Sequence, residues 1–129
     1  MRKKSFAIFV ALLSALTLHA QKQKVTVKID FGGNKPNESF QAEWYEGMTA
    51  MTALQSGADV ASHPIKTYIF VNTINGVKTE RGAEAWYYEV NGKSTGRIAF
   101  RYTVNPGDTI TWIYKKDVCS NTVDKKCEK

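Results

Sequence analysis

The sequence predicts an α+β domain made of a mixed sheet and one short helix. Two runs of alternating apolar and polar residues come first, at residues 24–31 and 40–44, and they indicate a β-hairpin. A helix-like spacing of apolar residues follows at residues 48–54, and three or four further strand-like segments complete the chain. This order favours a helix lying on one face of a mixed sheet. A β-grasp arrangement satisfies it best.

Length and composition indicate one globular domain. The chain has 129 residues, of which 43% are hydrophobic and 12% aromatic. One domain fits this length, and the apolar content is enough to bury a core, which argues against intrinsic disorder.

The first 20 residues have the layout of a secretory signal peptide. Basic residues at positions 2–4 precede an apolar run at residues 6–18, and cleavage is expected after Ala20. The apolar run is shorter than the ~20 residues of a membrane span, although an uncleaved anchor is the alternative. We therefore expect an exported chain, periplasmic or extracellular, with no membrane span after cleavage.

Residues 21–114 form the expected domain, and residues 115–129 form a charged tail. The mature chain keeps 15 basic and 12 acidic residues, a net charge of +3. Nucleic-acid binding usually needs a clustered basic patch, so we expect no nucleic-acid partner. In an oxidising compartment, Cys119 and Cys127 are expected to form a disulfide; free thiols and a metal or catalytic site are the alternatives.

The remaining elements follow from turn and cap signals. Thr49 is a suitable N-cap and Gly57 a suitable end for the helix. Residues 56–64 are interpreted as a loop and residues 65–74 as one long strand. The Asn75-Gly76 turn and a polar, mobile loop at residues 77–84 come next. Strands are then predicted at residues 85–90, 98–104 and 109–114.

The chain carries few signals of an enzyme. His63 is its single mature histidine, and no Gly-x-Ser-x-Gly stretch or phosphate-binding glycine loop is present. We therefore expect no catalysis. His63 is interpreted as a loop residue, and the alternative is axial ligation of the metal centre of a bound cofactor.

Aromatic residues are concentrated in the second half of the chain. One short helix cannot cover both faces of a sheet, so some of these rings are expected at a rim or on an open face. There they would form a platform for a flat ligand or a sugar; ordinary core packing is the alternative. The residues concerned are Tyr68, Phe70, Trp86, Tyr87, Tyr88, Tyr102, Trp112 and Tyr114.

Four stretches occur in an order that resembles a known family: GMTAMTAL, TINGV, AWYYEVNG and STGRIAFRYTVNPGDTITWIY. The family is the transcobalamin C-terminal-like domain, which is the small β-grasp domain of transcobalamin and intrinsic factor. It also occurs in exported bacterial proteins of unknown function. The resemblance covers roughly residues 25–114.

The resemblance implies binding without catalysis, with a corrinoid (cobalamin) as the ligand. It places the contacts at Tyr68, Thr73, Ile74, Asn75, Gly76, Trp86, Tyr87, Gly96 and Tyr102. The helical-barrel domain that completes the site in the vitamin carriers is missing, so a partner domain or a dimer would have to cover the other side of the ligand. The alternative is a protein- or glycan-interaction module of the cell envelope that uses the same surface.

Overall fold

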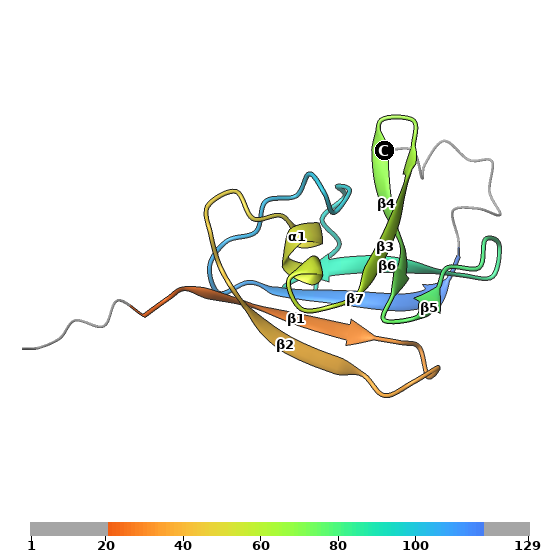
Figure 1. Ribbon diagram of the computed structural model, residues 1–129, viewed down its shortest axis with the longest axis horizontal. Coiled ribbons are helices and arrows are strands. Elements are labelled where there is room, and N and C mark those ends of the chain that lie inside the picture. The colour runs from red at the N-terminus through yellow and green to blue at the C-terminus, as the bar shows by residue number, and fades with distance from the viewer. Residues whose placement is uncertain (1–20, 118–129) are drawn as a thin grey trace, which may run out of the picture.

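Two sheets and one short helix make up residues 21–117, the part of the chain that the computed structural model describes (Figure 1). The predicted signal peptide and the predicted Cys119–Cys127 pair lie outside these residues. In chain order the elements are β1 (Lys24–Asp30), β2 (Glu38–Glu43), α1 (Ala50–Gln55), β3 (Val60–Ile65), β4 (Tyr68–Ile74), β5 (Val77–Lys78), β6 (Glu84–Val90) and β7 (Thr109–Lys116).

The larger sheet has four strands in the order β2-β1-β7-β6. Its central pair, β1 and β7, is parallel, with Thr26 opposite Thr109, whereas β2 and β6 join antiparallel at the two sides. The expected mixed sheet with one short helix is therefore confirmed. The smaller sheet is an antiparallel β3-β4-β5 unit.

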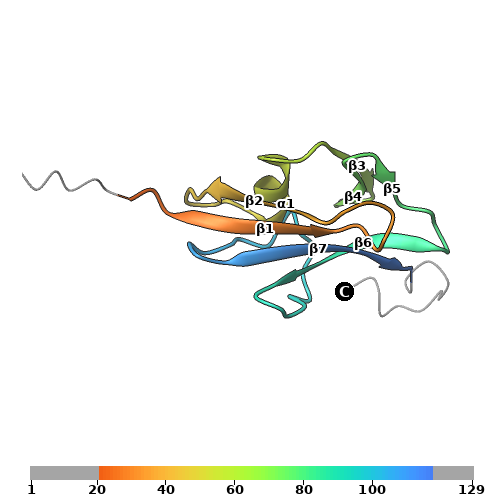
Figure 2. The same cartoon turned by 90° about the horizontal axis from the view of Figure 1, so that it is seen from below.

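One face of the larger sheet carries the core. Val27 of β1 lies opposite Phe40 on one side and Ile110 on the other, and Ile29 lies opposite Trp112. Val27, Ile29 and Ile110 have at most 1% of their surface exposed. Figure 2 shows α1 and the β3-β4-β5 sheet on the same side of the larger sheet, and they cover this apolar face. The alternation in β1 thus decides which face is buried.

The helix begins where the sequence predicts. The Thr49 hydroxyl accepts a hydrogen bond from the Thr52 amide (3.1 Å), and the Thr52 hydroxyl accepts one from the Thr49 amide (2.8 Å). This reciprocal capping satisfies two amides that the first helical turn leaves unpaired. The buried side of α1 consists of Ala50, Met51, Ala53 and Leu54.

Three predicted elements are wrong. The expected loop at residues 56–64 contains most of β3, which is the first arm of a hairpin. The expected single strand at residues 65–74 is divided: the second arm, β4, begins only at Tyr68. The expected strand at residues 98–104 is irregular apart from one bridge, Thr103 to Thr49. Its backbone pairs mainly with the start of α1, as described below.

Candidate functional site

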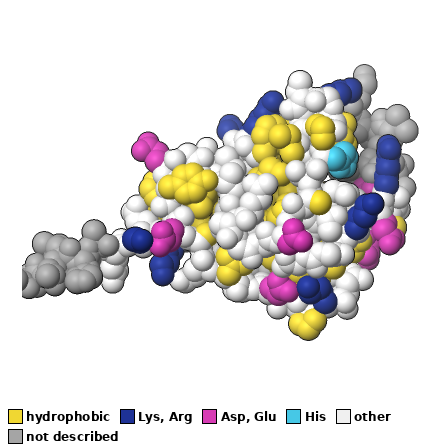
Figure 3. Space-filling view, viewed as in Figure 1, with side chains coloured by type: hydrophobic (Ala, Val, Ile, Leu, Met, Phe, Trp, Pro, Cys, Tyr) yellow, Lys and Arg dark blue, Asp and Glu magenta, His cyan; other side chains and the backbone are white. Residues whose placement is uncertain are grey.

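A hairpin of β3 and β4 projects from the body of the molecule (Figure 1). Its two arms are joined by Lys66 and Thr67, and Lys66 has a positive φ of 56°. Four large hydrophobic side chains among residues 21–117 are classed as exposed, and three of them lie on this hairpin: Ile65 (48%), Ile69 (40%) and Phe70 (38%). Figure 3 shows hydrophobic side chains, basic side chains and the single described histidine gathered on this part of the surface.

Each face of the hairpin tip is apolar. Ile65 lies opposite Tyr68, and His63 lies opposite Phe70. Because directly opposed residues point to the same side, these four side chains share one face. Pro64 and Ile69 form the next opposed pair and lie on the other face. We call the first surface, made of His63, Ile65, Tyr68 and Phe70, the aromatic face of the hairpin.

Arg101 joins the hairpin to a loop that follows β6. Its guanidinium lies 5.3 Å from the centre of the Tyr68 ring and 5.0 Å from that of Phe100. Both distances are within the range of a cation–π contact. The Tyr68 and Phe70 rings are themselves 6.3 Å apart. The tip therefore combines an apolar projection with a guanidinium stacked on aromatic rings.

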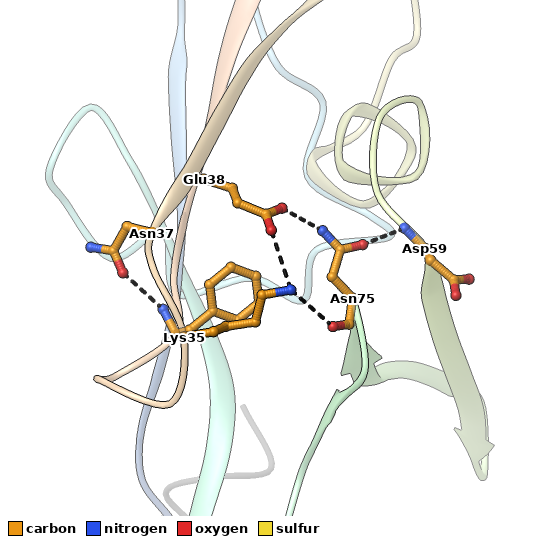
Figure 4. Close-up of polar contacts among 6 residues, drawn as sticks. Lys35, Asn37, Glu38, Asp59 and Asn75 are labelled. Atoms are coloured by element: carbon orange, nitrogen blue, oxygen red, sulfur yellow. Dashed lines mark hydrogen bonds and ion pairs between the residues drawn. The ribbon is translucent and has the colours of Figure 1, made fainter.

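The base of the hairpin is fixed by the side chain of Asn75 (Figure 4). Asn75 Oδ1 accepts a hydrogen bond from the backbone N–H of Asp59 (2.7 Å), and Asn75 Nδ2 donates one to Glu38 Oε2 (2.6 Å). Lys35 Nζ lies 3.2 Å from Glu38 Oε1 and donates to the Asn75 backbone carbonyl at 3.4 Å. Residues from the β1–β2 loop, the start of β3 and the end of β4 are thus held together.

The structure places the expected Asn75-Gly76 turn between β4 and β5. Asn75 and Gly76 have φ values of 45° and 84°, which this kind of tight hairpin turn requires. Ile74 is fully buried, and Thr73 is half-buried. The side chain of Asn75 is already hydrogen-bonded within the fold, so the turn serves mainly to anchor the hairpin.

Trp86 is a core residue. Only 8% of its surface is exposed, its ring packs on Phe31 and Tyr114, and its indole N–H donates to the Val77 carbonyl at 2.9 Å. The Tyr114 hydroxyl donates in the same way to the Lys78 carbonyl (2.7 Å). These two donors tie β5 to the larger sheet. The expectation that Trp86 presents an aromatic platform is therefore wrong.

The other expected contact residues are spread over the molecule. Tyr87 points to the opposite face of the larger sheet from Trp86, with Lys115 Nζ 5.1 Å from its ring centre. Gly96 lies in an exposed loop with a φ of 66°. Tyr102 is half-buried, 6.4 Å from the Tyr88 ring. The nine expected residues therefore form no single surface, and only Tyr68 lies at the hairpin tip.

Phe70 was among the aromatics expected on an open face, but sequence reasoning missed four other residues at the tip: Ile65, Ile69, Phe100 and Arg101. The contact between Arg101 and Tyr68 joins positions far apart in the chain, so no local pattern signals it. A hollow of 260 Å³ lies elsewhere, on the larger sheet, and is lined in part by Lys28, Asp30 and Thr111.

Two phenols, the half-buried Tyr88 and the buried Tyr114, remain protonated to higher pH than free tyrosine. Burial raises the pKa of Tyr88, whose hydroxyl is hydrogen-bonded to Thr95 Oγ1 and donates to the Arg97 carbonyl. Burial, followed by the negative charges of Glu84 and Glu80, raises the pKa of Tyr114. Both groups thus act as structural hydrogen-bond donors near neutral pH.

Within residues 21–117, no three or more His, Cys, Asp or Glu side chains come together in a way that could hold a metal ion. The single helix of this part of the chain has six residues, far fewer than the ~20 needed to cross a bilayer.

Comparison with known proteins identifies a family but no established activity. No curated protein matches the chain. A solved structure from Ruminococcus gnavus ATCC 29149, described as a "putative metal binding protein", is similar with a TM-score of 0.60 and 17% sequence identity; the match covers 74% of this chain and 99% of that one. At this identity the similarity concerns the fold alone. The model of the family called Domain of unknown function (DUF4430) matches residues 47–116, from just before α1 to the end of β7. Because this match spans more than half of the sequence, the chain belongs to the DUF4430 family.

Proposed function

We propose that this chain is a non-catalytic binding module whose projecting β3–β4 hairpin makes the principal contact. The observation that carries the proposal is the exposure of Ile65, Ile69 and Phe70 on one projecting element. Because these side chains are 38–48% exposed, covering one of them contributes about 0.6–1.4 kcal/mol, in proportion to the roughly 1.5–3 kcal/mol of full burial, and clustered exposed apolar residues mark interaction sites. The hairpin base is braced by the Asn75 hydrogen bonds, so the tip is held in position before binding.

A corrinoid is the ligand we favour. The aromatic face of the hairpin offers Tyr68 and Phe70 to an apolar ring face, with His63 beside them. The parallel pairing of the first and last strands around one helix supports a β-grasp topology, in keeping with a transcobalamin-like domain. A hairpin covers only one face of a flat ligand, so a second domain or a partner protein would complete the site.

We propose that the module acts outside the cytoplasm, because residues 1–20 have the layout of a signal peptide. Expression of the full chain in a Gram-negative host should give a mature protein that begins at Gln21 in the periplasmic fraction. N-terminal sequencing would show this directly, and an intact Met1 in the cytoplasm would reject export.

The alanine variant of Phe70 is predicted to weaken corrinoid binding about tenfold or more. Loss of a half-exposed aromatic contact removes a large part of the apolar area that the ligand could cover. Calorimetric titration with cyanocobalamin would measure the effect. Tyr45→Ala is the matched control, because Tyr45 is an aromatic residue outside the hairpin that is more exposed (51%) than Phe70 (38%). Equal affinities of the two variants would reject the hairpin as the corrinoid site, and the absence of binding to the unmodified protein would reject the ligand.

The second face of the hairpin favours another candidate function. Pro64 and Ile69 form an apolar pair opposite to the aromatic face, and a flat ligand cannot contact both. A groove in an envelope protein could hold the hairpin from both sides. The module would then recruit a protein, or a glycan through the aromatic face alone.

Ile69→Ser distinguishes the two functions. We expect this variant to reduce capture of an envelope protein by at least about tenfold, since it places a hydroxyl in an apolar contact, and to leave corrinoid affinity within a factor of about two. Capture from envelope extract by the tagged chain, quantified against Phe70→Ala, gives the comparison. If Ile69→Ser leaves capture unchanged while Phe70→Ala abolishes it, the partner contacts only the aromatic face, and the two-sided groove is excluded.

A further inference from the structure

Arg101 has an unusual environment for an exposed cation. Its guanidinium lies over two rings, those of Tyr68 and Phe100, and has no carboxylate partner among residues 21–117. Within residues 21–117 the ion pairs are Lys22 with Glu43 and Lys35 with Glu38, and neither involves Arg101. Ring contacts occupy the faces of a guanidinium and leave the N–H groups at its edge free to donate.

The backbone on both sides of Arg101 is fixed. The carbonyl of Ala99 accepts a hydrogen bond from the Met51 amide (3.2 Å), and the carbonyl of Tyr102 accepts one from the Ala50 amide (2.9 Å). The Arg101 amide itself donates to the Ile98 carbonyl (3.0 Å). The start of α1 therefore holds the loop that presents the guanidinium, and little chain entropy has to be lost when an anion binds.

The segments that carry the hairpin and the Arg101 loop are basic in sequence. Residues 60–79 and 91–107, which include the hairpin and the Arg101 loop, contain five Lys or Arg and no Asp or Glu: Lys66, Lys78, Lys93, Arg97 and Arg101. All twelve acidic residues of the chain lie elsewhere in the sequence. At the tip itself, the apolar surface is accompanied by Lys66 in the turn and by Arg101 over Tyr68, and this combination is complementary to an apolar molecule that carries negative charge.

We propose that Arg101 is an anion-binding residue of the hairpin site, and that the ligand is an amphipathic molecule with an apolar body and a phosphate or carboxylate group. The apolar body lies against Tyr68 and Phe70, and the guanidinium receives the oxygens in a two-pronged hydrogen bond. This inference rests on the proposed function, because it assigns the charge of the ligand that the hairpin binds.

Two fluorescent probes with the same ring skeleton test the proposal. The dye 8-anilinonaphthalene-1-sulfonate carries an anionic group, and N-phenyl-1-naphthylamine lacks it. We expect both to bind the mature chain and the anionic probe to bind more tightly. Arg101→Gln should weaken the anionic probe about tenfold, the effect of losing a charge-assisted pair, and leave the neutral probe within a factor of about two. Lys28→Gln, which removes an exposed cation from β1, is the matched control and should change neither.

The outcomes separate this inference from the proposed function. If Phe70→Ala weakens both probes but Arg101→Gln affects them equally, the apolar site stands and the anion-binding role is overturned. If Phe70→Ala changes neither probe, the hairpin is not the binding surface and both proposals fail. Unchanged thermal melting of Arg101→Gln would show that its effect is not one of unfolding.

Competition identifies the natural anionic group. 1-Naphthyl phosphate and 1-naphthoate share one ring system and differ in the head group. Displacement of the anionic dye by either, lost in Arg101→Gln, supports the proposal, and the tighter competitor indicates whether a phosphate or a carboxylate is preferred. Failure of both to displace the dye from the unmodified protein contradicts it.

Discussion

Replacing Trp86 with alanine is expected to lower the free energy of unfolding by about 3–5 kcal/mol, the usual loss for a large aromatic residue removed from a core. The change removes ring contacts with Phe31 and Tyr114 and leaves the Val77 carbonyl without its indole donor. A domain of this size is stable by only about 5–15 kcal/mol, so much of its stability would be lost.

Urea unfolding followed by far-UV circular dichroism would measure this effect. Trp86→Phe is the matched control, since it keeps an aromatic ring and removes the N–H donor, and it should be the milder of the two variants. An unchanged unfolding midpoint for Trp86→Ala would mean that the indole is dispensable to the core. The resemblance to vitamin carriers implies a ligand contact at this position, but the packing predicts a stability defect.

Asn75→Ala is expected to cost about 2–3 kcal/mol. Two side-chain hydrogen bonds are lost, at about 0.5–1.5 kcal/mol each, and alanine is disfavoured at a φ of 45° by about 1–2 kcal/mol. Because both hydrogen bonds are exposed to water, which can replace them, the expected loss of stability is smaller than the sum of the hydrogen-bond and backbone contributions. Because the lost contacts tie the hairpin to the β1–β2 loop, hydrogen exchange should increase most at the Asp59 amide.

Asn75→Gly separates the two causes. Glycine accepts the positive φ but lacks the side chain, so this variant should lose the hydrogen bonds without the backbone strain and be about 1 kcal/mol more stable than Asn75→Ala. Equal stabilities of the two variants would show that backbone conformation is unimportant here. Fast exchange spread evenly over the protein, with no excess at Asp59, would argue against a bracing role for the network.

The parts of the fold that the sequence predicts well are those where one face of a strand is buried. Val25, Val27 and Ile29 alternate with polar residues because β1 has a core on one side. The β3 strand was missed for the opposite reason: five of its six residues are exposed and it contains a proline. Its structure comes from pairing with β4, and a local pattern cannot show that.

Residues 98–104 illustrate a different failure. Their alternating composition suits a strand, but the carbonyls of Ala99 and Tyr102 accept hydrogen bonds from the first residues of α1. The amides at the start of a helix have no partner within the helix. Here they pair with the carbonyls of residues 98–104, which would otherwise pair with a neighbouring strand. The candidate site shows the same limit. Tyr68 could be proposed from its surroundings in the sequence, whereas the Arg101 contact depends on how distant segments pack.

The pairing of β1 with β7 has a consequence for how the chain folds. Thr26 meets Thr109, 83 positions later, so the sheet cannot close until almost all of the domain is available. Closing such a distant contact loses much chain entropy before it gains stability, which slows folding. The N-terminal hairpin then stays without its central neighbour during synthesis. A chain that folds late in this way is well suited to crossing a membrane unfolded, and a stop codon before β7 should yield a product that is degraded instead of a smaller working domain.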